Sequence, residues 1–183
     1  MLLFRHEARV SWGKSMGFFQ KLFSSTPTTI KLTSPLNGSL LPKSEIPDPT
    51  FADEVLGPTV CFKPGSDGVV YAPCDGVITQ IFKTAHAVTI SSNQKVELLI
   101  HVGINTVDLK GQGFEALVHD DEKVTAGQPL IKFDQEVIAR ANLSNLVPLV
   151  ICNVSDFAEV KFIEPQDSIS TKDVFCEITP HQK

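Results

Sequence analysis

The sequence predicts an all-β fold: an antiparallel β-sandwich or barrel with short helical segments and a flexible N-terminal arm. Eleven Gly and twelve Pro are spread along 183 residues, and short runs rich in Val, Ile and Thr lie between them. Turn residues therefore recur every several positions, which is typical of many short strands rather than of helices or βαβ units. With 42% hydrophobic residues, the chain can bury one ordinary core, so we expect one domain.

The first element is an arm over residues 1–29. Its end, Ser24–Thr29, contains only Ser, Thr and Pro, a linker composition that rarely packs. Residues 17–24 place apolar side chains at helical spacing, which predicts a short amphipathic helix on a surface. At under about three turns, this helix is marginal in water. We expect the folded domain over residues 30–183.

Turns and strands alternate through the rest of the chain. Residues 34–40 and 72–78 share the pattern of a small residue, Pro, two variable positions, Gly and a strand, which indicates a weak internal duplication. Residues 134–142 are expected to form one short helix. The turn signals are Pro35–Gly38, Pro47–Pro49, Pro64–Gly68, Asp75–Gly76, Ser92–Gln94, Lys110–Gly113 and Ala126–Gly127.

Composition also excludes some function classes. A net charge of −5 without a basic run argues against a nucleic-acid partner. No stretch approaches the roughly 20 apolar residues that a membrane-spanning helix needs. The four cysteines form no Cys-x-x-Cys pair, so we expect reduced thiols in or near the core of a cytoplasmic protein.

Two histidines lie on neighbouring predicted strands, residues 85–90 and 96–102. The polar loop 92–95 joins them as a hairpin. If that loop is symmetric, His86 stands directly opposite His101. Such pairs have Cβ atoms about 4.5–5.5 Å apart and face the same side, so the imidazoles would meet. An odd-length loop or a bulge would break this register.

This register also predicts an outer face that suits docking better than a core. A neutral imidazole is a nucleophile near neutral pH, and a second ring or a hydroxyl can fix its tautomer and bind a phosphoryl oxygen. Thr84 lies two residues before His86 and can supply that hydroxyl. The outer face would hold His86, Val88, Glu97, Leu99 and His101.

The segment His101–Phe114, HVGINTVDLKGQGF, resembles the signature of the glucose-type enzyme IIA family, His-x-Gly-Ile-Asp-Thr-Val-x-Leu-Lys-Gly-x-Gly-Phe. Further similar segments extend the resemblance from about Met16 to the end of the chain. They are Ile46–Ala52, Ala72–Ile78, Phe82–Ala87 and Val147–Asn153.

This resemblance implies a β-sandwich that accepts phosphate from the phosphocarrier HPr and passes it to the IIB domain of a sugar permease. In the family, the residue matching His101 carries the phosphate, the one matching His86 supports it, and Thr84 is oriented nearby. No cofactor is required. The docking surface implied by the family matches Asp48, Phe51, Phe82, Leu99, Asn105 and Val107.

The family also implies regulation by the unphosphorylated form. The implied partners are glycerol kinase, permeases outside the phosphotransferase system and adenylate cyclase. Zn²⁺ shared between His86, His101 and a partner carboxylate is implied as well, although two imidazoles make only half of a tetrahedral site.

One residue of the motif departs from the family pattern. Asn105 stands where the family has Asp, which removes a carboxylate and predicts weaker, less salt-sensitive docking to HPr.

Met16–Phe23 resembles the usual N-terminus of the family. Residues 1–15 would then follow from a start codon assigned too early, and a native extension is the alternative. The amphipathic segment implies at most weak contact with a membrane surface, because Lys14 and Lys21 give little positive charge.

Three other function classes stay open. A zinc hydrolase would need at least three protein ligands, and no His-x-His motif accompanies the pair. A lipoyl- or biotinyl-carrier module would need a modifiable lysine at a hairpin tip, a place that Lys95 occupies without the surrounding motif. A regulatory binding protein that no longer transfers phosphate is the third.

Overall fold

The computed structural model describes residues 28–182. The helix predicted over residues 17–24 and the start-site alternative at residues 1–15 lie outside the described residues, as does most of the predicted arm. The first strand begins at Ile30. No helix among the described residues is long and apolar enough to cross a membrane.

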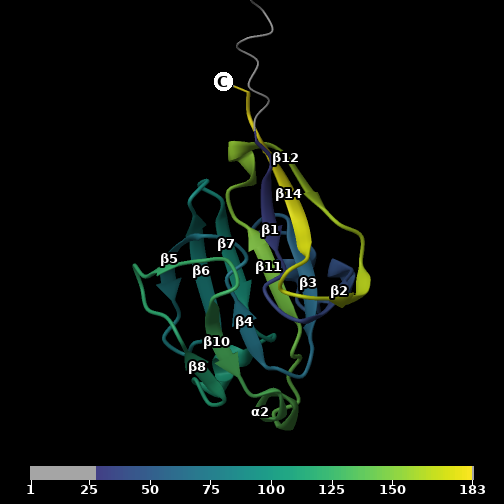
Figure 1. Cartoon of the computed structure of the whole chain (residues 1–183). Helices are drawn as coiled ribbons and strands as arrows, with labels where there is room; N and C mark the ends of the chain where they lie inside the picture. Colours follow the sequence, from purple (N-terminus) through teal and green to yellow (C-terminus); the bar gives the residue numbers. More distant parts are fainter. Residues whose placement is uncertain (1–27, 183) are drawn as a thin grey trace, which may run out of the picture.

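Antiparallel strands are the main regular element and helices are few and short, which confirms the predicted all-β class (Figure 1). The largest sheet has eight strands in the order β13-β2-β3-β11-β7-β6-β5-β9. Along the chain these are β2 (Gly38–Leu41), β3 (Thr59–Pro64), β5 (Gly76–Ile81), β6 (Ala87–Ser92), β7 (Glu97–His101), β9 (Lys123–Val124), β11 (Val147–Ile151) and β13 (Gln166–Ile169).

Two three-stranded sheets complete the sandwich. Their orders are β1-β14-β12 and β4-β10-β8. Their strands are β1 (Ile30–Thr33), β4 (Val69–Tyr71), β8 (Phe114–Ala116), β10 (Pro129–Phe133), β12 (Phe157–Phe162) and β14 (Val174–Pro180).

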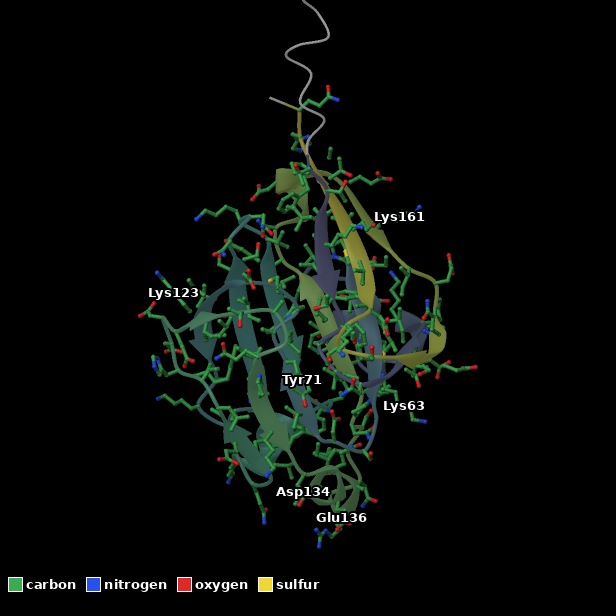
Figure 2. All side chains as sticks on the ribbon, viewed as in Figure 1. Lys63, Tyr71, Lys123, Asp134, Glu136 and Lys161 are labelled. Carbon is green, nitrogen blue, oxygen red and sulfur yellow. The ribbon has the colours of Figure 1, made fainter. Side chains whose placement is uncertain are left out.

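One main core joins the three sheets. Phe62 and Ile100 of the large sheet, Phe175 of β14 and Ile131 of β10 are all fully buried in it. Alternation explains much of the arrangement, since apolar side chains of most strands turn inward and polar ones outward, whereas β3 and β11 bury side chains on both faces. Figure 2 shows the outward side chains, including the exposed Lys63, Lys123 and Lys161.

The helical segments are short. The helix predicted over residues 134–142 is confirmed as α2 (Gln135–Arg140), at the lower end of the molecule in Figure 1. Asp134 begins it as the N-cap, accepting the N–H groups of Glu136 and Val137. The others are α1 (Pro49–Ala52), η1 (Lys43–Glu45), η2 (Thr106–Leu109) and η3 (Val154–Asp156).

The two similar sequence phrases lead into equivalent strands, β2 and β5. Their prolines are bonded in a reciprocal way: the Pro35 carbonyl accepts the N–H of Tyr71 at 2.7 Å, and the Pro73 carbonyl accepts that of Thr33 at 2.9 Å. Each phrase thus bonds to the residue just before the other phrase. This exchange supports the predicted duplication within one sandwich.

The cysteines only partly follow the prediction. All four thiols are free, and Cys61, Cys74 and Cys176 are buried. Burial raises the pKa of each of these three to about 12, so they stay protonated. Cys152 is exposed, because it follows the end of β11 where the chain leaves the sheet.

Candidate active site

The two predicted histidines meet, with ring centroids 4.9 Å apart and planes at 77°. The register that was expected to bring them together is wrong. His101 of β7 pairs with Ala87 of β6, and the Val102 N–H donates to the His86 carbonyl at 2.7 Å. Each pair is therefore shifted by one residue from the predicted one.

A three-residue loop, Asn93–Lys95, causes the shift. Ser92 N–H donates to the Val96 carbonyl at 2.8 Å, and the Ser92 hydroxyl accepts the Val96 N–H at 2.9 Å. Lys95 closes the loop in the left-handed region at φ 68°. The shift moves Val88 to the core side, fully buried, so its predicted place on the outer face is wrong.

His86 reaches His101 because it lies just before β6 rather than within it. The preceding turn is closed by the Ala85 N–H, which donates to the Phe82 carbonyl at 2.7 Å. Ala85 has φ 53°, which interrupts the alternation of side chains. The turn thereby brings the imidazole of His86 beside that of His101.

His101 has one ring nitrogen engaged by the backbone. Its Nδ1 lies 2.7 Å from the Gly103 carbonyl, and only Nδ1–H can donate to that acceptor. In the neutral ring, Nε2 then carries the lone pair. Burial lowers the pKa of His101, while the Gly103 bond and the charge of Asp48 act in the opposite direction. The neutral, nucleophilic form is thus favoured near neutral pH.

His86 is oriented by Thr84. The Thr84 Oγ1 lies 2.5 Å from Nδ1 of His86. His86 is only 6% exposed. If the hydroxyl donates, Nε2 carries the proton and is free to donate a hydrogen bond. Burial and, secondly, the neighbouring His101 lower the pKa of His86 to about 4.

Aromatic rings flank both histidines. Phe51 lies 5.3 Å from His101 and Phe82 lies 5.5 Å from His86, between ring centroids. Phe51 comes from α1, which starts at Pro49 after the N-cap Asp48. The Asp48 carboxylate accepts the Thr50 N–H at 2.8 Å.

The predicted docking residues differ in exposure. Asn105 and Val107 are exposed, Asp48, Phe82 and Leu99 are partly exposed, and Phe51 is buried. Burial of Phe51 results from a second small core that the sequence reasoning did not find. It covers the outer side of β3, β7 and β11 and contains Ile46, Phe51, Cys61, Ile104 and Val150, with Leu41, Ala52, Leu99 and Leu146 against it.

Asn105 suits its backbone position. It has φ 60° and ψ 17°, the left-handed conformation that Asn tolerates better than most residues. Its side chain caps no helix N–H. The amide is therefore free at the surface directly after the His101 turn.

A family model described as the phosphoenolpyruvate-dependent sugar phosphotransferase system, EIIA 1, matches residues 30–157. The chain belongs to this family. Both histidines and the turn that follows His101 lie inside the matched region. The resemblance found in the sequence is thereby confirmed.

Individual EIIA relatives agree. The chain is 37% identical over 144 residues to the glucose-specific EIIA component of Oceanobacillus iheyensis, covering 79% of this chain and 87% of that one. It is 42% identical over 145 residues to the glucose-specific EIIBCA component of Corynebacterium glutamicum, covering 79% of this chain but only 21% of that longer protein. The structure of the glucose permease IIA from Mycoplasma capricolum superposes with a TM-score of 0.76 at 29% identity, covering 82% of this chain and 96% of that one.

The EIIA site offers a metal two nitrogen ligands. Nδ1 of each histidine is engaged, by Thr84 or Gly103, which leaves the two Nε2 atoms. Residues 28–182 contain no group of three His, Cys, Asp or Glu side chains placed to hold a metal ion. Shared zinc would therefore need its remaining ligands from a partner.

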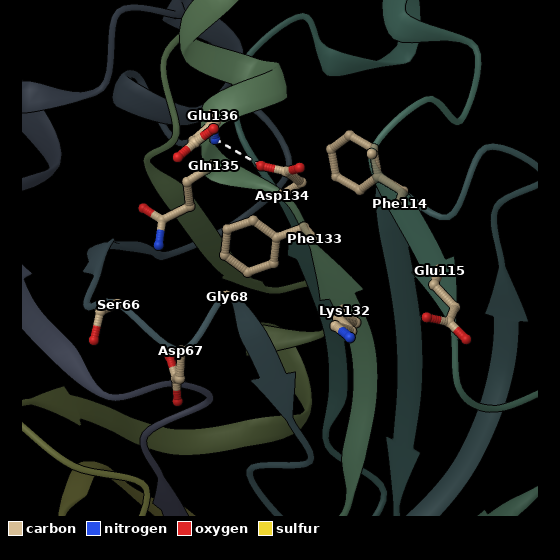
Figure 3. A pocket seen from close by; sticks show the side chains of 11 residues that line it. Ser66, Asp67, Gly68, Phe114, Glu115, Lys132, Phe133, Asp134, Gln135 and Glu136 are labelled. Carbon is tan, nitrogen blue, oxygen red and sulfur yellow. Dashed lines mark hydrogen bonds between the residues drawn. The ribbon is translucent and has the colours of Figure 1, made fainter.

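A cavity of about 630 Å³ lies away from the histidines, between the start of α2 and the β4-β10-β8 sheet (Figure 3). Neither histidine lines it. Two of its polar side chains already serve the fold: Asp134 caps α2, and Gln135 donates to the Gly65 carbonyl at 2.5 Å. Figure 3 shows Phe133 and Lys132 of β10 among its lining side chains. The cavity contributes nothing to the chemistry of the histidines.

Proposed function

We propose that this EIIA chain is a phosphocarrier that accepts a phosphoryl group from HPr on Nε2 of His101 and passes it to the IIB domain of a sugar permease. One observation carries the proposal. The bond between Nδ1–H and the Gly103 carbonyl leaves the Nε2 lone pair of His101 available beside His86.

In the transfer step, the Nε2 lone pair attacks the phosphorus of a phosphohistidine on HPr. An N–P bond forms to His101 while the donor's N–P bond breaks, and the donor imidazole leaves with that electron pair. No proton has to move at His101, because Nδ1 keeps its own. Transfer to a nucleophile of IIB breaks the new bond in the same manner.

His86 is proposed to stabilise the transferred group. With Thr84 donating to Nδ1, the Nε2–H of His86 can donate to a phosphoryl oxygen. A neutral donor of this kind is present throughout the physiological range, since the pKa of His86 is lowered to about 4. Thr84 and His86 therefore act as one unit.

The partners are proposed from the relatives and the surface. The EIIBCA name of the Corynebacterium glutamicum relative supports a IIB partner, and the glucose-specific names support glucose as the sugar. Val107 is 49% exposed and Asp48 lies beside His101, which suits an apolar patch with a basic rim on HPr. We place the relay in the cytoplasm.

In the unphosphorylated state, the same face is proposed to bind regulatory targets such as glycerol kinase, permeases outside the system or adenylate cyclase. Val55 and Leu56, three and four residues after α1, are 71% and 44% exposed. Large apolar side chains so exposed, on the segment that follows the helix carrying Phe51, support docking.

The test is phosphoryl transfer from phosphoenolpyruvate through enzyme I and HPr, scored by an acid-labile mass gain of about 80 Da. Wild type should be labelled and His101→Ala should not. His86→Gln should be labelled but should not pass the group to IIB. His119→Ala is the matched control, because the His119 side chain is 80% exposed and outside the site.

A folded wild-type protein that takes no label from active HPr would contradict the relay. The regulatory binding protein would then be the better description. Label that persists on His101→Ala would instead move the acceptor to another residue.

A further inference from the structure

Thr106 is a fully buried polar residue that the proposed chemistry does not use. It begins η2, five residues after His101. Its hydroxyl donates to the Val102 carbonyl at 2.5 Å. Buried hydroxyls with one well-defined partner fix backbone geometry, because breaking such a bond leaves both groups without water.

The bonded residue, Val102, connects the two histidines. Its N–H donates to the His86 carbonyl at 2.7 Å, and its carbonyl accepts Thr106. Movement of the Val102 backbone would therefore displace His86 relative to His101. Thr106 restrains that backbone through the Val102 carbonyl, while His86 engages its N–H.

The methyl group of Thr106 restrains the next residue. Gly103 has φ +74°, and a Cβ placed on it would lie 2.4 Å from Cγ2 of Thr106 and 2.8 Å from the Ser144 carbonyl oxygen. The Ile104 N–H donates to that same Ser144 carbonyl at 2.9 Å. The Gly103 backbone is thus packed against Thr106 and Ser144. This packing holds the Gly103 carbonyl in position to accept the Nδ1–H of His101.

We propose that Thr106 is a positioning residue for phosphoryl transfer, whose hydroxyl holds the Val102–Gly103 turn so that His101 keeps the Nδ1–H tautomer. The inference deepens the proposed phosphocarrier function and rests on it. If the turn relaxes, the Gly103 acceptor moves from Nδ1, the Nε2–H tautomer gains population, and the lone pair is lost from the reacting nitrogen.

The experiment compares Thr106→Val with Thr106→Ser. Valine keeps the size and removes the hydroxyl, whereas serine keeps the hydroxyl. Thr33→Val is the matched control, because the Thr33 hydroxyl also donates to a backbone carbonyl, that of Pro73 at 3.2 Å, from β1 of another sheet. Two quantities are measured on each folded variant: the ¹⁵N chemical shifts of the His101 ring at mildly alkaline pH, and the rate of label uptake from phosphorylated HPr.

In wild type, the ¹⁵N shifts should report a protonated Nδ1 and an unprotonated Nε2. Thr106→Val should move them toward a mixture of tautomers and slow uptake roughly fivefold or more, about the effect of one lost hydrogen bond. Thr106→Ser should restore both readouts, and Thr33→Val should match wild type in both. Should Thr106→Val unfold, Thr106→Ala, which leaves room for a water, is judged by the same criteria.

Wild-type ¹⁵N shifts in the hydroxyl-free variant would overturn the inference, even with slower uptake, since the loss would then be structural. Equal loss in Thr33→Val would overturn it too. If wild type takes no label at all, the phosphocarrier function fails, while the tautomer comparison still decides the role of Thr106.

Discussion

The ring nitrogens of the two histidines have different neighbours. Nδ1 of His101 meets a backbone carbonyl, which can only accept a hydrogen bond. Nδ1 of His86 meets the hydroxyl of Thr84, which can donate one. This difference leaves a lone pair on one Nε2 and a proton on the other, the combination that suits a nucleophile beside an anion-binding group.

A substitution at Asn105 tests how much one negative charge contributes to docking with HPr. Asn105→Asp should keep the structure, because Asp also tolerates the left-handed conformation at φ 60°. Binding to HPr should become several-fold tighter at low ionic strength, about 1 kcal/mol, and more salt-sensitive. Calorimetric titration at two salt concentrations measures both effects.

Asn105→Ser serves as the uncharged control and should bind as wild type does. An aspartate variant that binds no tighter at low salt would contradict the predicted role of the charge.

Among the elements, the strands of the duplicated phrases depend on close backbone contact. A Cβ on Gly76 at the start of β5 would lie 2.4 Å from the Ser91 carbonyl oxygen of β6. That contact belongs to the β5–β6 ladder, in which Gly76 pairs with Ser92. Neither strand can move away without losing ladder bonds, so only glycine fits there.

Gly76→Ala should therefore lower the free energy of unfolding by more than about 2 kcal/mol. Gly127→Ala is the control, because a Cβ there meets nothing within 4 Å and only its φ of +82° is strained. The control should lose about 1 kcal/mol. Urea denaturation of both variants measures the difference, and equal losses would contradict the steric explanation.

For the whole molecule, a buried neutral histidine links stability to pH. The pKa of His86 is lowered to about 4, mainly by burial and secondly by His101. An unfolded histidine titrates near 6.5, so between these values the unfolded state binds more protons. The contribution to stability is fully present above about pH 6.5 and is lost as pH falls toward about 4.

The expected loss between about pH 6.5 and about pH 5 is roughly 2 kcal/mol from His86. The lowered pKa of His101 adds a further loss of stability as the pH falls. The charge of Asp48 acts to raise the pKa of His101 and so makes this further loss smaller. Denaturant midpoints across this range measure the slope. His86→Gln should flatten the slope, and an unchanged slope would show that other groups cause it.

Local sequence patterns were sufficient for much of this fold. The α2 helix was predictable because Asp134 is a capping residue before a helix-forming run, and the glycines and prolines marked the turns between strands. His86 was correctly expected to meet His101, but the strand register behind that expectation is wrong. A three-residue loop ordered by the Ser92 hydroxyl shifted the strands, and a left-handed Ala85 compensated by turning His86 toward its partner.

The sequence by itself determined the β class, the family and which two histidines form the candidate site. Composition, turn residues and the His101–Phe114 motif are local properties, so they can be read without the fold. Only the tertiary structure decided the register, the burial of Phe51 and the engagement of each ring nitrogen. The ring-nitrogen partners Thr84 and Gly103 are each only two residues away in the chain, but the turn that presents the Gly103 carbonyl to His101 is held by the distant Ser144 carbonyl. No local pattern specifies such contacts, because the free energy that selects them comes from packing the whole core.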